Sequence, residues 1–427
     1  MPVSVRAGIV VTGTEVLSGR VADRNGPWVS ERLGELGCET SHIICVGDRP
    51  GDLRSALAFL RDAGVDLIFT TGGLGPTADD LTAEIVAGFA GRELVLDEAM
   101  ERRITEIVAG FARRMRFDPE GLREGTRKQA MVPEGALALD PAGTAPGLVV
   151  ATDGPVVVVL PGPPRELQAM WPAAVAAPPV AAVLVDAGSY AIATMKMFGV
   201  PESTLAKTLR EIERTIDLTP LEITTCLRRG AELEIDVRYR ESEVELRDSL
   251  FLALRERHGR FVYTERGETI DALVAQLLAG RSIAVAESCT GGLLAARLSA
   301  LPGASGYLKG GVVSYSNEAK IDLLGVPARL IEREGAVSPP VAEAMATAAR
   351  ERFGADLGVG ITGIAGPGGG TEEKPVGYVC ICVLDGAGNL LARDPQLPGG
   401  RDDVRDRSVS VALHMIRRLL IGEDLPV

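Results

Sequence analysis

Apolar and polar positions along the first third of the chain predict strands and helices in alternation. Continuous apolar runs of strand length occur at residues 6–11, 40–46 and 66–71. Amphipathic stretches with helical spacing occur at residues 28–36, 52–62 and 80–90. Two more apolar strands are expected at residues 147–151 and 156–160. This alternation predicts a parallel sheet that is covered on both faces and binds ligands at the carboxyl ends of its strands.

The pattern changes at about residue 181, where charged residues become frequent. One stretch in this region, residues 233–239, alternates as a half-buried strand does, and helical segments flank it. Residues 181–263 therefore predict a small α+β module, and no cluster of catalytic residues stands out in it.

Strand and helix patterns alternate again from residue 266 onward. The expected helices span residues 269–278, 293–301, 339–353 and 404–420, and the expected strands span 282–286, 312–315, 357–361 and 376–383. The predicted fold class is therefore α/β. Two α/β domains, residues 1–175 and 266–425, are joined by the α+β module at residues 181–263.

Composition narrows the function classes. The chain has 427 residues, of which 46% are apolar, and its net charge of −13 makes direct nucleic-acid binding unexpected, because neutralising phosphates requires clustered Lys and Arg. No apolar run reaches the roughly 18 residues that a membrane span needs. The first residues lack the charged and then apolar layout of a signal peptide. We expect a cytoplasmic protein.

Cysteine and histidine usage argues against two common kinds of site. The six cysteines form no C-x-x-C pair and no zinc spacing, and free thiols in a reducing compartment explain them. None of the three histidines, His42, His258 and His414, lies in a polar or glycine-rich loop that resembles a site. A Ser-His-Asp triad or a His-ligated zinc is therefore not expected. An activated serine would take lysine or tyrosine as its base.

Ser288 stands where an apolar strand turns into a helix, in the sequence Ala-Glu-Ser-Cys-Thr-Gly-Gly that ends at Gly292. The backbone N–H groups at a helix start have no partner within the helix and suit an anion or an oxyanion. Ser288 could be a nucleophile or merely a helix cap, which is the commoner role of such a serine. Cys289 is an alternative nucleophile.

Four polar clusters follow apolar strands in the last domain. They span residues 287–290, 314–320, 362–370 and 399–403. Each could be a solvated loop when taken alone, but loops at strand ends commonly carry function in α/β folds. Together they favour an acyl or amide hydrolase that acts on a phosphate-bearing small molecule.

The clusters supply the groups that such chemistry requires. Lys320 could accept the serine proton if burial lowered its pKa, and Lys374 is the other candidate. Tyr315 could relay or orient that proton. Thr362 offers a hydroxyl beside a glycine-rich loop, and Arg401 could bind a phosphate or a carboxylate.

The first domain carries two motifs of its own, at residues 13–25 and 71–82. Glycines after a strand let the backbone approach a phosphate. Asp79 and Asp80 open the helix expected at 80–90 and could hold a divalent cation that bridges a pyrophosphate. Alternatively, they are only the acidic residues that a helix N-terminus favours.

The last domain resembles the C-terminal domain of the CinA family, a nicotinamide mononucleotide deamidase. The resemblance rests on the strings AESCTGGLLAARL, GGVVSYSNEAKIDLLGV, GAVSPPVAEAMA, GITGIAGPGGGTEEKPVG and GGRDDVR. It implies hydrolysis of the nicotinamide mononucleotide amide to nicotinate mononucleotide and ammonia, with no cofactor. Ser288 would be the nucleophile, Lys320 its base, and Tyr315 and Thr362 supporting residues. The substrate-binding residues would be Thr290, Gly291, Asn317, Gly363, Gly366 and Arg401, with Arg405 left open as the alternative to Arg401.

The first domain resembles the molybdopterin-binding fold found at the N-terminus of CinA proteins. For this domain the resemblance implies hydrolysis of ADP-ribose to AMP and ribose 5-phosphate, with Mg²⁺ or Co²⁺ held by Asp79 and Asp80. The phosphate and nucleotide site would comprise Gly13, Glu15, Asn25, Gly72, Gly73, Gly75, Thr77, Lys128, Gly143 and Thr144. The alternatives are a domain that binds a pterin or nucleotide without turnover, and a protein partner in DNA uptake or recombination.

The resemblance extends to the whole architecture, in which the middle module would be of KH type. This label concerns the fold only, because the module lacks a G-x-x-G clamp loop and is not strongly basic. From the resemblance as a whole, the expected partners are nicotinamide mononucleotide, ADP-ribose and a second copy of the chain in a homodimer.

Overall fold

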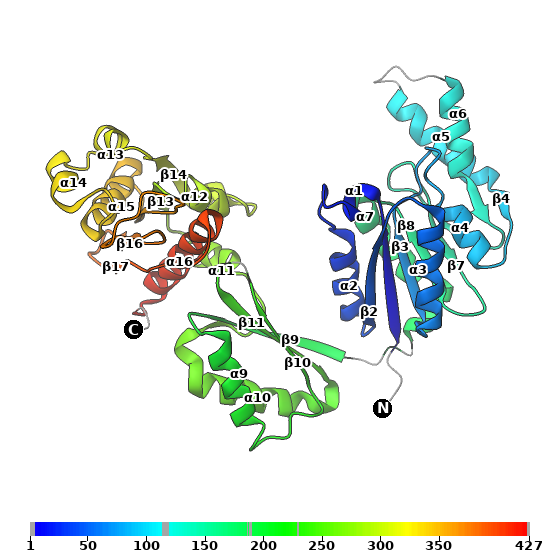
Figure 1. Cartoon of the computed structure of the whole chain (residues 1–427), viewed down its shortest axis with the longest axis horizontal. Helices are drawn as coiled ribbons and strands as arrows, with labels where there is room; N and C mark the ends of the chain where they lie inside the picture. Colours follow the sequence, from blue (N-terminus) through cyan, green and yellow to red (C-terminus); the bar gives the residue numbers. More distant parts are fainter. Residues whose placement is uncertain (1–4, 113–118, 186, 188–189, 229, 425–427) are drawn as a thin grey trace. The chain divides into compact units, whose positions relative to one another are not determined.

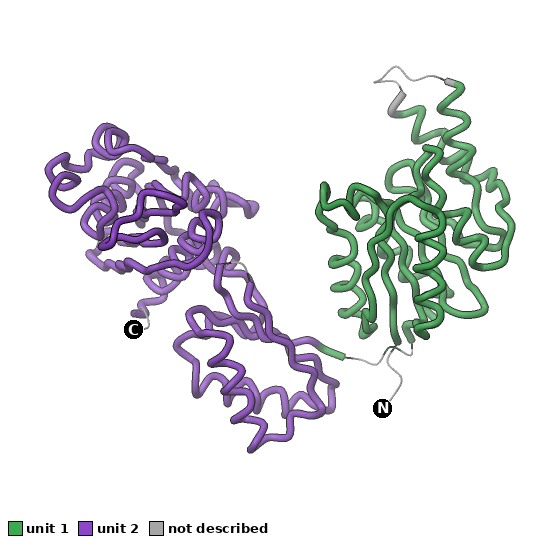
Figure 2. Tube along the Cα trace, viewed as in Figure 1, with its two compact units in different colours: residues 1–191 green, residues 192–427 purple. Residues whose placement is uncertain are grey.

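The computed structural model describes residues 5–112, 119–185, 187, 190–228 and 230–424 (Figure 1). The chain divides into two compact units, residues 1–191 and 192–427 (Figure 2). The mixed α/β class predicted from the sequence is confirmed. The second unit holds both the middle module and the last domain, and the three-domain boundaries stay a prediction.

The first unit is built on a six-stranded sheet in the order β2-β1-β3-β8-β7-β6. Its strands are β1 (Arg6–Thr12), β2 (Glu39–Val46), β3 (Leu67–Thr71), β6 (Leu137–Leu139), β7 (Gly147–Val150) and β8 (Val156–Leu160). The first three and β8 are parallel, whereas β7 is antiparallel to both of its neighbours. The sheet is therefore mixed, because the short connection at 151–155 permits a hairpin but no parallel crossover.

Helices cover both faces of this sheet (Figure 1). One core contains residues of α2 (Asn25–Glu35) and α7 (Pro164–Ala176), and the other contains residues of α3 (Pro50–Asp62) and α4 (Thr82–Phe89). The remaining elements are α1 (Thr14–Leu17), β4 (Leu94–Leu96), α5 (Glu98–Ala112), α6 (Pro119–Gln129), β5 (Met131–Pro133) and α8 (Pro178–Leu184). The chain runs from β1 to β2 on one side of β1, and then to β3 on the other side of β1. The boundary between β1 and β3 is therefore a topological switch point.

The middle module has a four-stranded sheet in the order β10-β11-β9-β12. Its elements are β9 (Tyr190–Phe198), α9 (Glu202–Ile212), β10 (Glu222–Leu227), β11 (Glu232–Arg240), α10 (Val244–His258) and β12 (Val262–Thr264), with short 3₁₀ turns at Glu241–Glu243 and Gly259–Phe261. The strand predicted at 233–239 lies within β11, where buried and partly exposed positions alternate. The α+β expectation is thus confirmed for the described residues, and the KH-type label stays a prediction.

The last domain has a five-stranded sheet in the order β14-β13-β15-β16-β17. Its strands are β13 (Ile283–Glu287), β14 (Leu308–Val313), β15 (Leu357–Gly363), β16 (Val379–Asp385) and β17 (Leu390–Arg393). Its helices are α11 (Ile270–Leu277), α12 (Leu293–Leu298), α13 (Asn317–Leu324), α14 (Ala328–Glu334), α15 (Pro339–Phe353) and α16 (Arg401–Ile421), with a 3₁₀ turn at Ala304–Gly306. The first three strands in this order are parallel, and β16 and β17 are antiparallel additions.

Two different helix layers enclose that sheet. Residues of α11, α12 and α16 share one core with β13 and β15, and α15 packs on the opposite face. There Gly358 and Gly360 of β15 lie directly under carbonyl groups of α15, so that a Cβ at either position would collide with helix backbone. Glycine at these strand positions permits the close approach of helix and sheet.

No single helix in the described part of the chain has the length and hydropathy to cross a membrane. The bent pair α7 and α8 meets those criteria only when its two helices are taken together. The inner face of α7, however, belongs to the core of the first unit, including Leu167, Met170 and Trp171.

Candidate active sites

The Ser288 hydroxyl stands at the turn between β13 and α12. The Ser288 N–H donates to the Ile361 carbonyl of β15 at 2.9 Å, so the turn is tied to the neighbouring strand. Gly291 and Gly292 follow with φ of +61° and +95°, which are left-handed values that favour glycine. The sequence therefore forms a sharp turn here, and the Ser288 side chain is held at the carboxyl end of the sheet.

Lys320 reaches the same point from α13. Its side chain is only 2% exposed, and its Nζ donates to Ser288 Oγ at 3.0 Å and to the Ser314 carbonyl at 2.9 Å. Removal from water lowers the pKa of Lys320, because burial disfavours the charged ammonium. The structure thus brings together the serine and the lysine that the sequence singled out, over a separation of 32 residues.

Cys289, the alternative nucleophile, occupies a different environment. Its side chain is buried, and burial raises the pKa of the thiol to about 12. At neutral pH the sulfur is therefore protonated, whereas the thiolate is the reactive form of cysteine. This position favours Ser288 over its neighbour.

The start of α12 is not the open anion site that the sequence suggested. The buried Glu287 carboxylate accepts hydrogen bonds from the backbone N–H groups of Gly292, Leu294 and Ala295, at 3.0, 3.1 and 2.8 Å. A side chain of the chain itself therefore satisfies these three donors, and an external anion must bind elsewhere. The acidic residue just before the turn is the sequence signal for this role.

Arg401 and Tyr315 meet beside this turn. One guanidinium nitrogen of Arg401 donates to the Tyr315 hydroxyl, and the other donates to the Gly366 carbonyl at 2.7 Å. The Tyr315 side chain is 57% exposed, so the pair faces solvent. Arg401, at the start of α16, thus contacts two other residues predicted for the site, which come from two separate loops.

Arg405, the alternative to Arg401, lies against the turn that carries Ser288. Its Nη2 donates to the Thr290 carbonyl at 3.1 Å, and the same nitrogen lies 3.4 Å from where a Cβ on Gly291 would be. Among the described residues, Arg405 Nε and the buried Thr290 Oγ1 have no hydrogen-bond partner. Arg401 and Arg405, both at the start of α16, therefore line this region.

Other predicted residues of this domain lie less directly at the serine. The Thr362 hydroxyl is buried and donates to the Ala336 carbonyl at 2.8 Å, and Lys374 Nζ donates to the Glu334 carbonyl at 2.7 Å. Both side chains thus hold the connection between α14 and α15. Asn317 is exposed in the first turn of α13, and Gly363 ends β15.

In the first unit, the predicted glycines gather at the β1/β3 switch point. Gly13 follows β1, while Gly72 and Gly73 follow β3, and all three have positive φ. Thr82 Oγ1 donates to the Gly72 carbonyl at 2.9 Å and packs against Gly73. The Glu15 carboxylate lies beside Gly13. Loops that are 60 residues apart in the sequence therefore meet at this sheet edge.

Asn25 joins two strand ends of this site. Its Nδ2 donates to Thr71 Oγ1 and to the Gly162 carbonyl, both at 2.7 Å. The side chain is buried, and among the described residues its Oδ1 has no partner. Such an orphaned acceptor is costly unless a ligand or water supplies a donor.

Asp79 and Asp80 precede α4 and do not open it, since the helix begins at Thr82. Asp80 Oδ2 accepts hydrogen bonds from the Thr77 N–H at 2.9 Å and from the Thr77 hydroxyl at 2.5 Å, and the hydroxyl also contacts Asp79. Lys128 Nζ donates to the Thr77 carbonyl. These local bonds compete with helix formation and delay the helix start by two residues.

The two carboxylates fit a metal that also binds phosphate. Within the described residues no group of three or more His, Cys, Asp or Glu side chains could hold a metal ion. Mg²⁺ commonly takes one or two carboxylates and completes its shell with phosphate oxygens and water. The hydrogen bond from Thr77 lowers the pKa of Asp79, which keeps that carboxylate charged. A phosphate-bridged cation therefore suits this donor set better than a metal held by protein alone.

The remaining predicted residues stand further along the same edge. Thr144 Oγ1 accepts from Gln129 Nε2 at 3.4 Å, and the Glu166 carboxylate lies against Gly143, where a Cβ would collide with it. Burial raises the pKa of Glu166. Likewise, the Asp80 carboxylate occupies the space that a Cβ on Gly75 would need.

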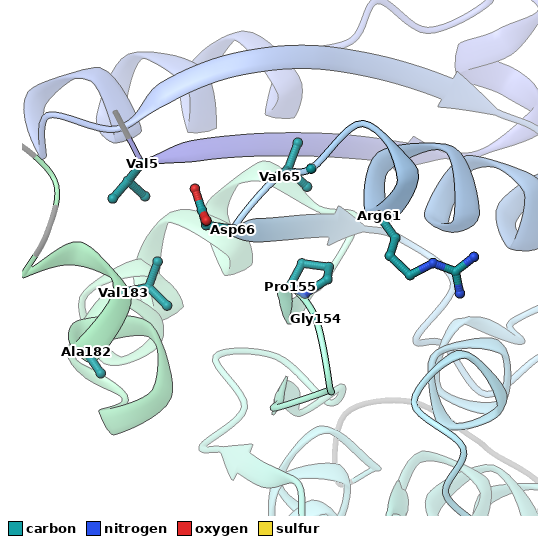
Figure 3. A pocket seen from close by; sticks show the side chains of 9 residues that line it. Val5, Arg61, Val65, Asp66, Gly154, Pro155, Ala182 and Val183 are labelled. Carbon is teal, nitrogen blue, oxygen red and sulfur yellow. The ribbon is translucent and has the colours of Figure 1, made fainter. Parts of the chain in front are cut away.

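A larger pocket of about 900 Å³ lies at the opposite end of the sheet (Figure 3). Val5, Asp66 and Pro155, which stand just before β1, β3 and β8, line it together with Val183 of α8. Because ligands of such sheets bind at the carboxyl ends of the strands, we do not assign the predicted site to this pocket.

Comparisons with known proteins agree with this architecture. Residues 267–420 match the CinA C-terminal domain, and residues 8–181 match a probable molybdopterin binding domain. A CinA-like protein of Mycolicibacterium gilvum is 60% identical over 421 residues, covering 98% of this chain and 99% of the relative. A CinA-like protein of Mycobacterium marinum is 57% identical over 425 residues, covering 98% and 100%.

A solved structure, that of a competence/damage inducible protein from Agrobacterium tumefaciens, is 40% identical, with a TM-score of 0.34. The match covers 35% of this chain and 94% of the chain in that structure. The two domain matches and the full-length relatives lead to one conclusion: the chain belongs to the CinA family.

Proposed function

We propose that the last domain is a metal-independent serine amidohydrolase that deamidates nicotinamide mononucleotide to nicotinate mononucleotide. The observation that carries the proposal is the 3.0 Å contact between Ser288 Oγ and the buried Lys320 Nζ. A serine hydroxyl needs a base, and a desolvated lysine can be neutral enough to serve.

The reaction then follows in two steps. Ser288 Oγ attacks the carboxamide carbon while Lys320 accepts the hydroxyl proton, and the lysine returns this proton to the departing ammonia. Water next attacks the resulting ester with Lys320 as base, which releases the carboxylate and the serine hydroxyl. We assign Tyr315 and Thr362 as supporting residues of this pair. The substrate-binding residues would be Thr290, Gly291, Asn317, Gly363, Gly366 and Arg401, of which Arg401 suits the substrate phosphate.

The test is ammonia release from nicotinamide mononucleotide in the presence of EDTA. Wild-type protein should release ammonia, and Ser288→Ala should reduce the rate by at least about 1,000-fold, as loss of a nucleophile does in serine hydrolases. Ser299→Ala, which removes an exposed hydroxyl at the end of α12, is the matched control and should retain activity. No release by the wild type would refute the proposal.

For the first unit we propose metal-dependent hydrolysis of the pyrophosphate bond of ADP-ribose, which gives AMP and ribose 5-phosphate. Its support is the pair Asp79 and Asp80 at the β1/β3 switch point, beside glycines that leave the backbone accessible to phosphate. The pair would hold Mg²⁺ or Co²⁺, which would neutralise charge on the pyrophosphate. The two activities together would recover products of pyridine-nucleotide breakdown.

This second activity is tested by AMP formation from ADP-ribose with Mg²⁺ or Co²⁺. Asp80→Ala should abolish it, while Asp62→Ala, an exposed acidic residue at the end of α3, should not. Binding of ADP-ribose without cleavage under either metal would instead support a non-catalytic nucleotide-binding domain.

A further inference from the structure

A small cleft opens where the loops after β1, β2 and β3 converge. Thr12, Asp48, Arg49, Gly73, Asp79 and Thr82 are among the residues that line it. It therefore lies at the switch point of the sheet and includes two residues already predicted for the nucleotide site, Gly73 and Asp79. The loop after β2, which supplies Asp48 and Arg49, was not among the predicted site residues.

The carboxylates of this cleft already have local partners. Asp48 Oδ2 accepts from the Thr14 N–H at 3.0 Å and from the Thr14 hydroxyl at 2.7 Å, and Asp79 Oδ1 accepts from the Thr77 hydroxyl. Neither acidic side chain is paired with Arg49 across the cleft within the described residues.

Arg49 is the one basic residue among those that line the cleft. Its side chain is exposed, and the described residues offer no hydrogen bond or ion pair to its guanidinium. Lys128, the cation predicted for this site, is instead bound to the Thr77 carbonyl. The guanidinium of Arg49 is therefore free to take a ligand.

The backbone that carries Arg49 is fixed. Arg49 is the N-cap of α3, and Pro50 follows in the first turn. The hydrogen bonds between Asp48 and Thr14 join this position to the loop after β1. A held backbone with an unpaired side chain at the ligand end of the sheet is the arrangement expected of a binding residue.

We propose that Arg49 binds a phosphate group of a nucleoside diphosphate ligand at the mouth of this cleft, whose interior of about 10 Å³ is too small to hold the ligand itself. The proposal rests on the nucleotide-binding function proposed above for the first unit. A guanidinium matches two phosphate oxygens at once, and it would offset the negative charge that the carboxylates around the cleft impose on a pyrophosphate. The metal pair and Arg49 would then contact the same anionic group from the loops after β3 and β2.

The test measures the Kd of ADP-ribose by calorimetry on the full-length protein in EDTA, beside adenosine as a phosphate-free probe. Arg49→Ala should raise the Kd of ADP-ribose by about 10- to 100-fold, as loss of a hydrogen bond to a charged group does. Arg49→Lys should fall between, because lysine keeps the charge but not the bidentate contact. Arg54→Ala, an exposed arginine of α3 outside the cleft, should bind as the wild type does.

The outcomes separate this inference from the proposed activity. Hydrolysis by the wild type with an unchanged Kd and KM in Arg49→Ala would overturn the role of Arg49 and leave the pyrophosphatase intact. Binding in EDTA that is weakened in Arg49→Ala, together with no hydrolysis by the wild type under Mg²⁺ or Co²⁺, would support Arg49 and refute the pyrophosphatase. A wild type that neither binds ADP-ribose in EDTA nor hydrolyses it with Mg²⁺ or Co²⁺ would overturn both. An equal loss of adenosine binding would show that Arg49 does not act through phosphate.

Discussion

At the scale of single residues, the chemistry proposed for the last domain depends on Lys320, a lysine that is almost completely buried. Lys320 lies between Ser288 Oγ and the Ser314 carbonyl, and within the described residues it has no ion pair. Both neighbours can accept a hydrogen bond from the ammonium, but neither carries a charge that would offset burial. The protonated and neutral forms are thereby brought closer in free energy.

The pH dependence of deamidation should follow this lysine. Because burial lowers the pKa of Lys320 below 10.5, kcat/KM should rise with pH as the amine loses its proton and level off above the lowered pKa. Lys320→Arg should be inactive, since a guanidinium stays protonated. The check is a pH–rate profile by ammonia release. A profile without this ascending limb, or an active arginine variant, would contradict the role of Lys320.

Glu287 should matter to both stability and activity. Glu287→Ala leaves three backbone N–H groups at the start of α12 without their acceptor, and we expect a loss of about 1–3 kcal/mol in the free energy of unfolding. The Ser288 turn should also loosen, which lowers kcat. Denaturant unfolding gives the free energy, and Glu332→Ala, an exposed residue of α14, is the control. Equal stability of the two variants would count against this account.

At the scale of elements, helix packing on the last sheet depends on residues that have no side chain. Gly358 and Gly360 point at α15, and the carbonyl groups of Ala346 and Ala342 lie where their Cβ atoms would be. Helix and strand backbone therefore touch directly. This contact also sets the height of α15 above β15, whose end carries Thr362.

Gly360→Ala should consequently destabilise the protein. The added methyl meets helix backbone, which cannot rotate away as a flexible side chain can, and overpacking of this kind costs about 1–3 kcal/mol. Gly368→Ala is the matched control, because Gly368 has open space around it and no positive φ. Thermal or denaturant unfolding compares the two, and a stable Gly360→Ala would mean that α15 can shift outward.

At the scale of the whole molecule, the middle module and the last domain form one unit through contacts to α16. The His414 ring stacks on Phe198 with centroids 3.8 Å apart, and its Nε2 lies 3.2 Å from Glu232 Oε1. Tyr263 donates to the other oxygen of Glu232 at 3.0 Å. Arg418 on the next turn donates to the Arg260 carbonyl. The helix that begins with Arg401 at the candidate site thus continues into the contact with the middle module.

We expect His414 to make this contact sensitive to pH. Burial lowers the pKa of His414 below 6.5 despite Glu232, and Arg417 and Arg418 act in the same direction as burial. The folded state therefore favours the neutral ring, so its contribution to stability is present above pH 6.5 and is lost as pH falls toward the lowered pKa.

The free energy of unfolding of the second unit should accordingly fall as the pH is lowered from 7.5 to 5.5. In His414→Phe this fall should be smaller, because phenylalanine cannot bind a proton. Denaturant titrations at the two pH values measure this slope. His42→Phe, in β2 of the first unit, serves as the control and should keep the wild-type slope for the second unit. The same slope in His414→Phe and the wild type would exclude His414 as the source.

Local sequence patterns determined much of the secondary structure of this protein and the position of its main motif. Apolar runs and helical spacing predicted the strands and helices of both α/β domains, because burial of one face imposes a period that single residues reveal. The motif around Ser288 and Lys320 was likewise evident, since small, polar and glycine residues are concentrated where strands end.

Only the tertiary structure decided which of these groups meet. It turned β7 against β8, placed Glu287 rather than an open anion site at the start of α12, and joined Lys128 to the Thr77 loop instead of leaving it free. It also brought Arg49 to the switch point and left its charge unpaired within the described residues. These outcomes depend on distances between segments remote in the chain, which hydrophobic periodicity does not encode.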